Sequence, residues 1–413
     1  MRWHLYGAER GGPPGPQRGP EQARHRAPRA PDCKVKPLPV HGIPGNGRVG
    51  GEGAQPGRSG FRLLPSGAEA YAARALSARE AASSLDIQTY IWHADLTGKR
   101  LAWHALQAAD RGVRVRILVD DMDGRAKNSA LAALDTHPGI EVRLYNPLVS
   151  RDGSLRRLGE LGLRLRRLNH RMHNKSWIAD NRIALVGGRN LGDEYFGAHD
   201  GTNFVDLDVL MAGPVVRELS ASFDAFWNSS ANYPIATLPD GAPPPEELER
   251  LRAILLEAAR QLPASPCAGV LADDAGVAAL HGDAAGLEWT AEWKFVSDEP
   301  LKATLPPASR SRVLAALVPA LDATRHHVFL ISPCFVPGQG GARTLADADR
   351  RGVDVRVLTN SLAATGVAAV HSGYARYGRT LLEQGVELWE RPAAQPGPCA
   401  RAPSRPTGTA WPT

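Results

Sequence analysis

A histidine and a lysine two residues apart, inside a longer polar pattern, are the residues of this sequence best suited to chemistry. His173 and Lys175 are followed by Asp180, and Asn190 comes shortly after a Gly-Gly pair at 187–188. A neutral imidazole can attack phosphorus, and a lysine two positions later on an extended strand shares its face. Ammonium and amide groups donate hydrogen bonds to phosphate oxygens. The pattern therefore predicts phosphodiester chemistry.

The cysteines suggest neither a metal site nor a disulfide framework. Cys33, Cys267, Cys334 and Cys399 lie far apart and show no CxxC spacing. We expect reduced thiols, and chemistry that uses no metal and no other cofactor.

The net charge of +6 comes from the N-terminal segment. Residues 1–60 hold ten Lys or Arg and four Asp or Glu, whereas the other residues hold 39 of each sign. The body of the chain is thus unlike a uniformly basic nucleic-acid binder. One basic cluster, from Arg151 to Lys175, leads into the motif. It predicts either attraction of an anionic phosphodiester or bilayer surface, or simply a solvated charged face.

The hydrophobic pattern predicts an α/β fold in which strands alternate with helices. Strands are expected at 85–93, 113–121, 141–147, 176–180, 181–188 and 204–213. Helices are expected at 67–84, 96–112, 129–136, 213–230 and 246–262. The strand, helix, strand order calls for a parallel sheet with covering helices. The two strands within 176–188 are expected to pair as a hairpin that turns at residues 180–182.

An internal repeat predicts two related halves. DRGVRVRILVD at 110–120 matches RRGVDVRVLTN at 350–360 with a constant offset of 240. A second copy of the histidine motif would fall at residue 413, and the sequence holds only one. We expect a disordered Pro/Gly/Arg-rich segment at 1–60 and a first lobe at 61–235. A linker with a helix is expected at 236–295, a partial second lobe at 296–390 and a disordered Pro-rich tail at 391–413.

The pattern HxKx4Dx6GGxN resembles the HKD motif of the phospholipase D superfamily. The chain is most similar to bacterial cardiolipin synthases of that type, from about residue 61 to about residue 390. The segments that carry this likeness are YIWHADLTG, MHNKSWIADNRIALVGGRNLGDEYFG, FVDLDVLMAGPVV, FVSDEP, ISPCFVPG and LTNSLAAT. The resemblance implies a phospholipase D-like pseudo-twofold pair of α/β/α sandwich lobes. The second lobe is expected to be incomplete, because a second HKD motif is absent.

The resemblance also implies a reaction. One histidine of such enzymes attacks a phosphatidyl donor and forms a phosphohistidine, and the other acts as general acid and then base. Phosphatidylglycerol accepts the phosphatidyl group, which gives cardiolipin without a metal. A chain with one motif is expected to be impaired in this reaction.

The resemblance and the chemistry together suggest a role for each motif residue. His173 is the expected nucleophile. Asp206 is the candidate carboxylate that fixes its tautomer, because superfamily members place an acidic partner on the strand after GGRN; Asp208 is the alternative. Lys175 and Asn190 are expected to stabilise the equatorial oxygens of the transition state.

Four further residues in or beside the motif are expected to support it. Asp180 completes the HKD pattern and is interpreted as bracing Lys175 or the turn. Arg171, Gly188 and Arg189 are expected to bind substrate. His93 is interpreted as a structural or surface histidine, with lining of the pocket as the alternative.

Three functions compete on the sequence alone. The first is a cardiolipin synthase-like phosphatidyltransferase with an anionic phospholipid such as phosphatidylglycerol as its partner. The second is a hydrolase or nuclease that works as a dimer with one motif per chain, which the neutral body disfavours. The third is a non-catalytic lipid-binding remnant. No run of 18 apolar residues and no secretory signal is evident, so a bacterial protein peripheral to the cytoplasmic membrane is expected.

Overall fold

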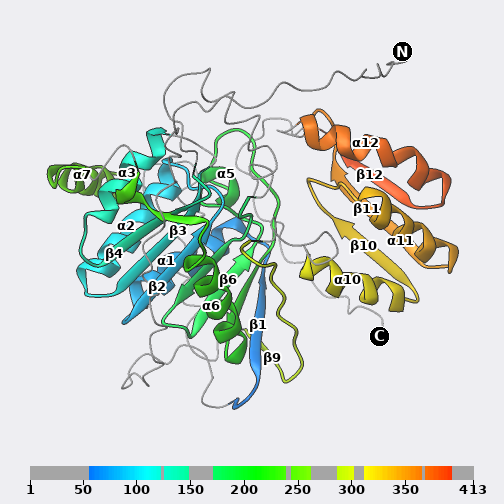
Figure 1. The fold of residues 1–413 in the computed structure, drawn as a ribbon, viewed down its shortest axis with the longest axis horizontal. Helices are drawn as coiled ribbons and strands as arrows, with labels where there is room; N and C mark the ends of the chain where they lie inside the picture. Colours follow the sequence, from blue (N-terminus) through cyan, green and yellow to red (C-terminus); the bar gives the residue numbers. More distant parts are fainter. Residues whose placement is uncertain are drawn as a thin grey trace, which may run out of the picture. The chain divides into compact units, whose positions relative to one another are not determined.

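The computed structural model describes residues 55–121, 125–147, 171–238, 243–261, 286–301, 311–364 and 368–392. The predicted terminal segments lie almost entirely outside these residues, and so does the basic cluster between Arg151 and Arg167. The described residues form two sheets with their covering helices (Figure 1).

The first sheet has nine strands in the order β8-β4-β3-β2-β5-β6-β7-β1-β9 within the described part of the chain. The strands are β1 Ser59–Leu64, β2 Ser84–Thr89, β3 Arg114–Asp120, β4 Ile140–Tyr145, β5 Ser176–Ala179, β6 Ile183–Gly187, β7 Asp208–Ala212, β8 Asn232–Pro234 and β9 Glu288–Thr290. The central strands β2, β3 and β4 are parallel, as the alternating pattern predicts. The remaining pairs are antiparallel.

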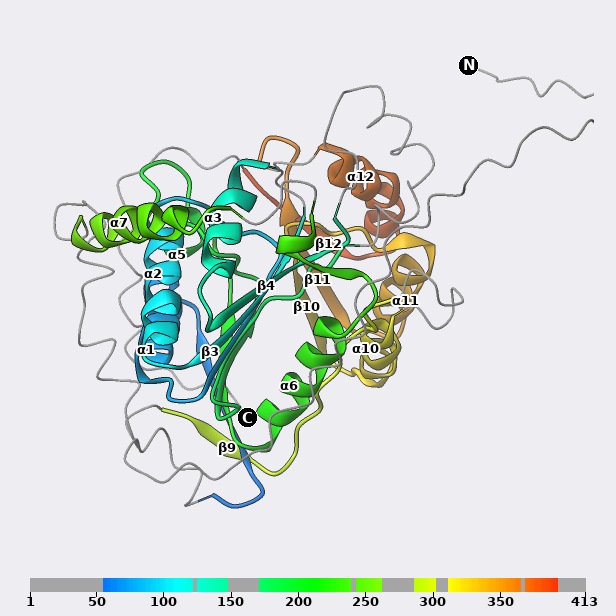
Figure 2. The ribbon, with the colours of Figure 1, turned by 60° about the vertical axis from the view of Figure 1, so that its left-hand side comes forward.

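Helices cover both faces of this sheet. They are α1 Gly67–Glu80, α2 Leu96–Asp110, α3 Arg125–Asp135, α5 Asp193–Phe196, α6 Pro214–Trp227 and α7 Glu246–Arg260, with a short 3-10 turn, η2, at Ile235–Thr237. Helices α1 and α2 lie on one face and α6 on the other (Figure 2). The α/β class is therefore confirmed, with a separate apolar core on each face.

The hairpin that carries the motif forms as predicted. Strands β5 and β6 pair antiparallel, with Ser176 opposite Val186. Asp180 and Asn181 at the turn both have φ of 53°. The loop between the paired residues Ala179 and Ile183 has three residues, 180–182, and Asp and Asn are the non-glycine residues that tolerate positive φ best.

Several boundaries differ from the sequence prediction; for example, the strand expected at 85–93 ends at Thr89. The strand expected from Phe204 begins only at Asp208, because residues 202–207 run without regular pairing before β7. Strand β9, inside the segment predicted as a linker, pairs with β1 and extends the first sheet. Pattern alone misses such an edge strand, since its three residues are partly exposed and have no alternation to read.

A buried ion-pair cluster ties α6 to the sheet. Arg116 on β3 donates to both oxygens of Asp86 at 2.6 Å and to Asp224 of α6 at 2.8 Å. Its guanidinium also lies over the rings of Phe223 and Trp227, at 4.7 and 5.4 Å from their centroids. The cluster satisfies a carboxylate that is 1% exposed in the middle of the sheet.

The second sheet repeats the first βαβ plan. Strands β10 His327–Ile331, β11 Asp354–Asn360 and β12 Glu387–Arg391 are parallel, and its helices are α10 Arg312–Ala323, α11 Gly338–Arg350 and α12 Ala368–Glu383. Gly112 after α2 and Gly352 after α11 have φ of 90° and 85°. The next residue in each copy donates to a carbonyl in the last turn of its helix, Ala108 or Ala348. The offset of 240 thus marks a structural duplication.

One face of the second sheet packs on helices and the other exposes apolar side chains. Val328, Val355 and Val357 are buried in its core. The alternate positions Phe329, Ile331, Leu358 and Trp389 are 39–79% exposed. No helix in the described residues of either half is long and apolar enough to span a bilayer.

The Arg116 cluster gives a stability prediction. Arg116→Ala leaves the Asp86 charge buried without its partner, so we expect a loss of roughly 3–5 kcal/mol in the free energy of unfolding. The measurement is urea denaturation followed by circular dichroism. Arg250→Ala removes an exposed pair with Glu247 and serves as the control, with a change under about 0.5 kcal/mol. Equal effects of the two substitutions would contradict the role of the cluster.

Candidate active site

His173 and Lys175 meet immediately before β5. The Lys175 ammonium nitrogen lies 3.0 Å from Nδ1 of His173 and donates to the His173 carbonyl oxygen at 2.8 Å. The Tyr90 ring completes the group: its centroid is 4.7 Å from the His173 ring and 5.2 Å from Lys175 Nζ. Tyr90 follows the end of β2, which pairs with β5, so sheet register brings the three together.

Lys175 is held in a partly desolvated position. It is 7% exposed, whereas His173 is exposed. Burial lowers the pKa of Lys175 to about 8, and the nearby carboxylates of Asp206 and Asp120 oppose this shift. Near neutral pH the side chain is therefore a cation whose charge is weakly screened by water.

A close approach of backbone to carboxylate explains the Gly-Gly pair. A β-carbon at Gly188 would collide with the Asp206 carboxyl group, and one at Gly187 would collide with Asp208. Strand β6 therefore passes tightly against the residues that precede and begin β7. Gly188 shapes the site through this close packing.

The structure separates the two candidate carboxylates. Asp208 is fully buried, with its Oδ2 2.8 Å from Arg74 and its Oδ1 3.7 Å from Arg189. Asp206 lies in the irregular residues before β7, where its side chain accepts the Leu207 N–H at 2.7 Å. Burial raises the pKa of Asp206, and Arg189 and Lys175 oppose the shift. Of the two, Asp206 is thus the carboxylate in electrostatic contact with Lys175.

Arg189 has an internal position in place of the substrate-facing position expected from the sequence. Its side chain is 1% exposed. The guanidinium donates to the carbonyl oxygens of Leu64, Pro65, Tyr195 and Asp206. These bonds fasten the residues after β6 to β1 and to the Asp206 segment, and they use the donors that a substrate would need.

Asn190 joins two loops at the edge of the sheet. Its Oδ1 accepts the Ile91 N–H at 3.1 Å, and its Nδ2 donates to the Tyr195 hydroxyl at 2.8 Å. An amide nitrogen carries two hydrogens, so one donor remains after the bond to Tyr195.

Asp180 lies at the other end of β5 from His173 and Lys175. Its carboxylate accepts the N–H groups of Ala82, Ser83 and Ser84 at 2.7–2.9 Å. The bracing expected of this residue therefore acts on the backbone between α1 and β2, and Lys175 is not its partner.

A buried carboxylate holds the residues just before His173. Asp120, at the end of β3, accepts the Met172 N–H at 2.9 Å, and Arg171 lies 3.3 Å away. Burial raises the pKa of Asp120 to about 7 despite these two partners. Arg171 also donates to the Asn146 carbonyl at 3.4 Å, so its guanidinium has protein partners in this structure.

A hollow of about 520 Å³ opens beside the His173 group. Its walls include residues of β1, β2, β5, β6, β7 and α6 and of the segment after β9. The lining includes His173, Lys175, Gln88, Gly187, Lys294 and Phe295. A cavity of this size falls within the roughly 300–1,000 Å³ typical of small-molecule sites.

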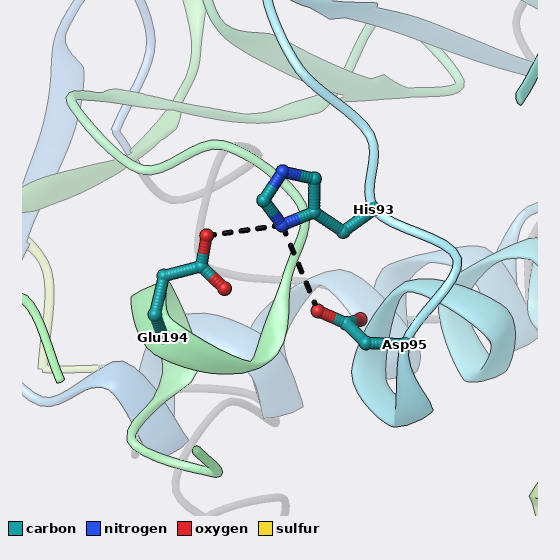
Figure 3. A group of neighbouring side chains, drawn as sticks. All are labelled: His93, Asp95 and Glu194. Carbon is teal, nitrogen blue, oxygen red and sulfur yellow. Dashed lines mark ion pairs between the residues drawn. The ribbon is translucent and has the colours of Figure 1, made fainter. Parts of the chain in front are cut away.

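His93 belongs to a separate polar group shown in Figure 3. Its Nδ1 is 3.0 Å from Glu194 and 3.8 Å from Asp95, and the three potential ligand atoms lie within 4.8 Å of one another. Asp95 already accepts the N–H groups of Gly98 and Asp193, which caps α2. The group could hold a cation, but an imidazolium or Nδ1–H donating to Glu194 accounts for its geometry.

Sequence reasoning missed Tyr90 and Asp120. Tyr90 lies in the quoted segment YIWHADLTG, and Asp120 ends a predicted strand, but neither position suggested contact with the motif. Both residues lie at the carboxyl ends of predicted parallel strands, and side chains at such ends gather at one edge of a sheet. This location could have indicated that they lie near the motif.

The chain is similar in sequence to proteins described as cardiolipin synthases. Residues 77–227 match the family model described as cardiolipin synthase, PLD-like domain. The chain is 39% identical over 343 residues to cardiolipin synthase C of Escherichia coli, covering 81% of this chain and 70% of that protein. It is 27% identical to cardiolipin synthase A of Pseudomonas syringae, covering 73% and 50%. Phosphatidylserine synthase of Haemophilus influenzae has a similar fold, with a TM-score of 0.51 at 13% identity over 81% of this chain and 74% of that one.

The Asp120 contact predicts local order before His173. Asp120→Ala removes the acceptor of the Met172 N–H, so we expect faster hydrogen exchange in a peptide covering residues 171–176. Asp120→Asn keeps an acceptor oxygen and should have a smaller effect. Asp110→Ala, which removes a distant surface carboxylate, is the control. Unchanged exchange in Asp120→Ala, measured by mass spectrometry, would show that the segment is held by other contacts.

Proposed function

Because this chain belongs to the phospholipase D superfamily and groups there with the cardiolipin synthases, we propose that it is a phosphatidyltransferase that works through a phosphohistidine. The donor is a phospholipid phosphodiester. The proposed acceptor is phosphatidylglycerol, which would give cardiolipin. Peripheral contact with an anionic membrane surface, where both lipids reside, is part of the proposal.

One observation carries it: an exposed imidazole and a buried lysine ammonium lie 3.0 Å apart beside the same hollow. A phosphate placed in that hollow would meet a nucleophile and a desolvated cation together. Such a cation stabilises charge on the phosphoryl oxygens more strongly than a solvated one.

The other motif residues are assigned by their surroundings. Asp206 is proposed to orient the His173 ring and to stabilise its charge as the phosphorus–nitrogen bond forms. The free Nδ2 hydrogen of Asn190 is proposed to reach a non-bridging oxygen of the phosphate. Asp180, Gly188 and Arg189 are proposed to support the site from a distance, through the backbone contacts described above.

The proton on His173 sets a condition for attack. As long as Lys175 is an ammonium that donates to Nδ1, the neutral ring carries its hydrogen on Nε2. An anionic phosphate is a better acceptor for the ammonium than an imidazole nitrogen. Substrate binding is therefore proposed to draw Lys175 away from Nδ1, so that Nδ1 takes the proton and Nε2 becomes the nucleophile.

The proposed transfer occurs in two steps. In the first, a His173 nitrogen bonds to phosphorus and the bond to the head-group oxygen breaks, so that this oxygen needs a proton. In the second, the acceptor hydroxyl loses a proton as its oxygen displaces His173. Since the sequence holds one HxK pattern, we expect both proton transfers to be slow and the phosphohistidine to persist.

Trapping the intermediate tests the nucleophile. Protein mixed with vesicles of ³²P-labelled phosphatidylglycerol and quenched in alkali should carry label that is stable to base and released by acid, as expected for phosphohistidine. His173→Ala should reduce labelling to background. His137→Ala, which removes a histidine paired with Asp110, is the matched control. Retention of the label in His173→Ala would exclude this residue as the nucleophile.

The products of the same incubation separate the competing functions. Labelled cardiolipin supports the transferase, and phosphatidic acid indicates a hydrolase. Cleavage of added DNA indicates a nuclease. Vesicle binding with neither label nor product indicates a lipid-binding protein without catalysis.

The pKa of Lys175 predicts the pH above which the rate of labelling falls. Its pKa of about 8 means that the ammonium is present below this pH and is lost as the pH rises through it. The rate of labelling, measured between pH 6 and 10, should therefore fall above about pH 8. Lys175→Arg should label more slowly, but its alkaline limb should move to higher pH because a guanidinium keeps its proton. An unmoved limb in Lys175→Arg would assign it to another group.

A further inference from the structure

A second cavity, of about 340 Å³, lies between α2, α3 and α7 and is separate from the hollow at His173. Helices α2 and α3 contact strands of the first sheet, and α7 packs on both of these helices (Figure 2). Small residues leave the space: Gly98 and Ala102 on α2, Ala130 on α3, and Ala94 just before α2. The Trp92 ring and four leucines form the rest of the cavity wall: Leu131 and Leu134 from α3, and Leu251 and Leu255 from α7.

The walls offer almost no hydrogen bond to a ligand. Ten of the twelve lining residues are apolar or glycine, and the others are His93 and Lys99. The indole N–H of Trp92 already donates to the Gly98 carbonyl at 2.9 Å. A polar ligand would lose its hydration there without compensation, so the body of any occupant must be hydrocarbon.

The lining includes one lysine, Lys99, which lies in the first turn of α2. Among the described residues its ammonium has no ion-pair partner. The His93 Nδ1 is taken by Glu194, at 3.0 Å. An anionic or ester-bearing end beside Lys99, with an apolar tail between the helices, describes an acyl lipid.

The wall of this cavity is continuous with the catalytic edge. Trp92 forms a parallel bridge with Leu191, the residue after Asn190. The preceding residue, Ile91, donates to Asn190, and Tyr90 contacts His173. The loop that contacts His173 through Tyr90 therefore also lines the apolar cavity through Trp92, so a phospholipid with its phosphate at His173 would have the cavity near its acyl chains.

We propose that this cavity receives a fatty acyl chain of the phosphatidyl donor, an inference that rests on the proposed function for the identity of the ligand. Each methylene that leaves water adds roughly fourfold in affinity. The chamber therefore favours long-chain donors over short-chain ones and holds the donor while its head group is exchanged.

Filling the cavity tests the proposal. Ala130→Phe and Ala102→Leu place bulk inside it, and Ala253→Phe adds the same ring to an exposed position of α7 that does not line it. Folding of each variant is checked by its thermal transition. Two substitutions with different bulk keep the test open should one of them fail to fold.

Binding is measured with cis-parinaric acid, a straight-chain fatty acid that fluoresces in apolar surroundings. We expect the parent and Ala253→Phe to bind it, palmitate to displace it better than octanoate, and both filling variants to bind at least tenfold more weakly. Equal binding by the parent and a folded filling variant would overturn the proposal, and so would absence of binding to the parent.

Activity then separates this proposal from the proposed function. With donors of two chain lengths, the filling variants should lose phosphatidyl transfer from dioleoyl-phosphatidylglycerol at least tenfold and keep that from the dihexanoyl form. Equal loss for both donors would overturn the acyl-chain role. Probe binding that is lost on filling, in a protein that transfers neither donor, would support the cavity as a lipid site and reject the transferase function.

Discussion

The arrangement of the site depends on the buried contact between Asp208 and two arginines. A carboxylate with no exposed surface is tolerated only where cations and donors surround it, and Arg74 and Arg189 supply them. Arg189 in turn binds four backbone carbonyls, from β1, α5 and the residues before β7. This network fixes the segment after β6, so the positions of Asn190 and Asp206 follow from it. Replacement of the paired glycines would push the strands apart at the same place.

The sheet then brings the nucleophile to this framework. Strand β5 pairs antiparallel with β2, and this places the beginning of β5 beside the end of β2. His173 and Lys175 therefore meet Tyr90 from one side, while Asn190 bonds to Ile91 from the other. Asp120, at the end of the neighbouring strand β3, holds Met172. Residues more than fifty positions apart converge because parallel strands end at one edge.

The duplication has different consequences in the two halves. Both contain the same βαβ plan, down to the glycine that ends the crossover helix. In the first half the β5–β6 hairpin extends the sheet beyond β2, and α6 covers its second face. The second sheet contains three parallel strands in the described residues, and Phe329 and Trp389 are exposed on its surface. The chemistry proposed for this protein is therefore assigned to residues of the first half alone.

The sequence by itself determined the family, the α/β class, the hairpin and the pairing of His173 with Lys175. These features depend on short-range patterns: a strand face repeats every two residues, and a tight turn needs residues that accept positive φ. Only the tertiary structure separated the two carboxylates, because Asp206 and Asp208 have the same spacing until β7 is seen to begin at Asp208 and Asp208 is seen to pair with Arg74 and Arg189. Only the tertiary structure showed that the Arg189 side chain is buried against backbone carbonyls and that Asp180 accepts the N–H groups of residues 82–84. Such choices are made by burial and by long-range hydrogen bonds, which leave no local pattern in the chain.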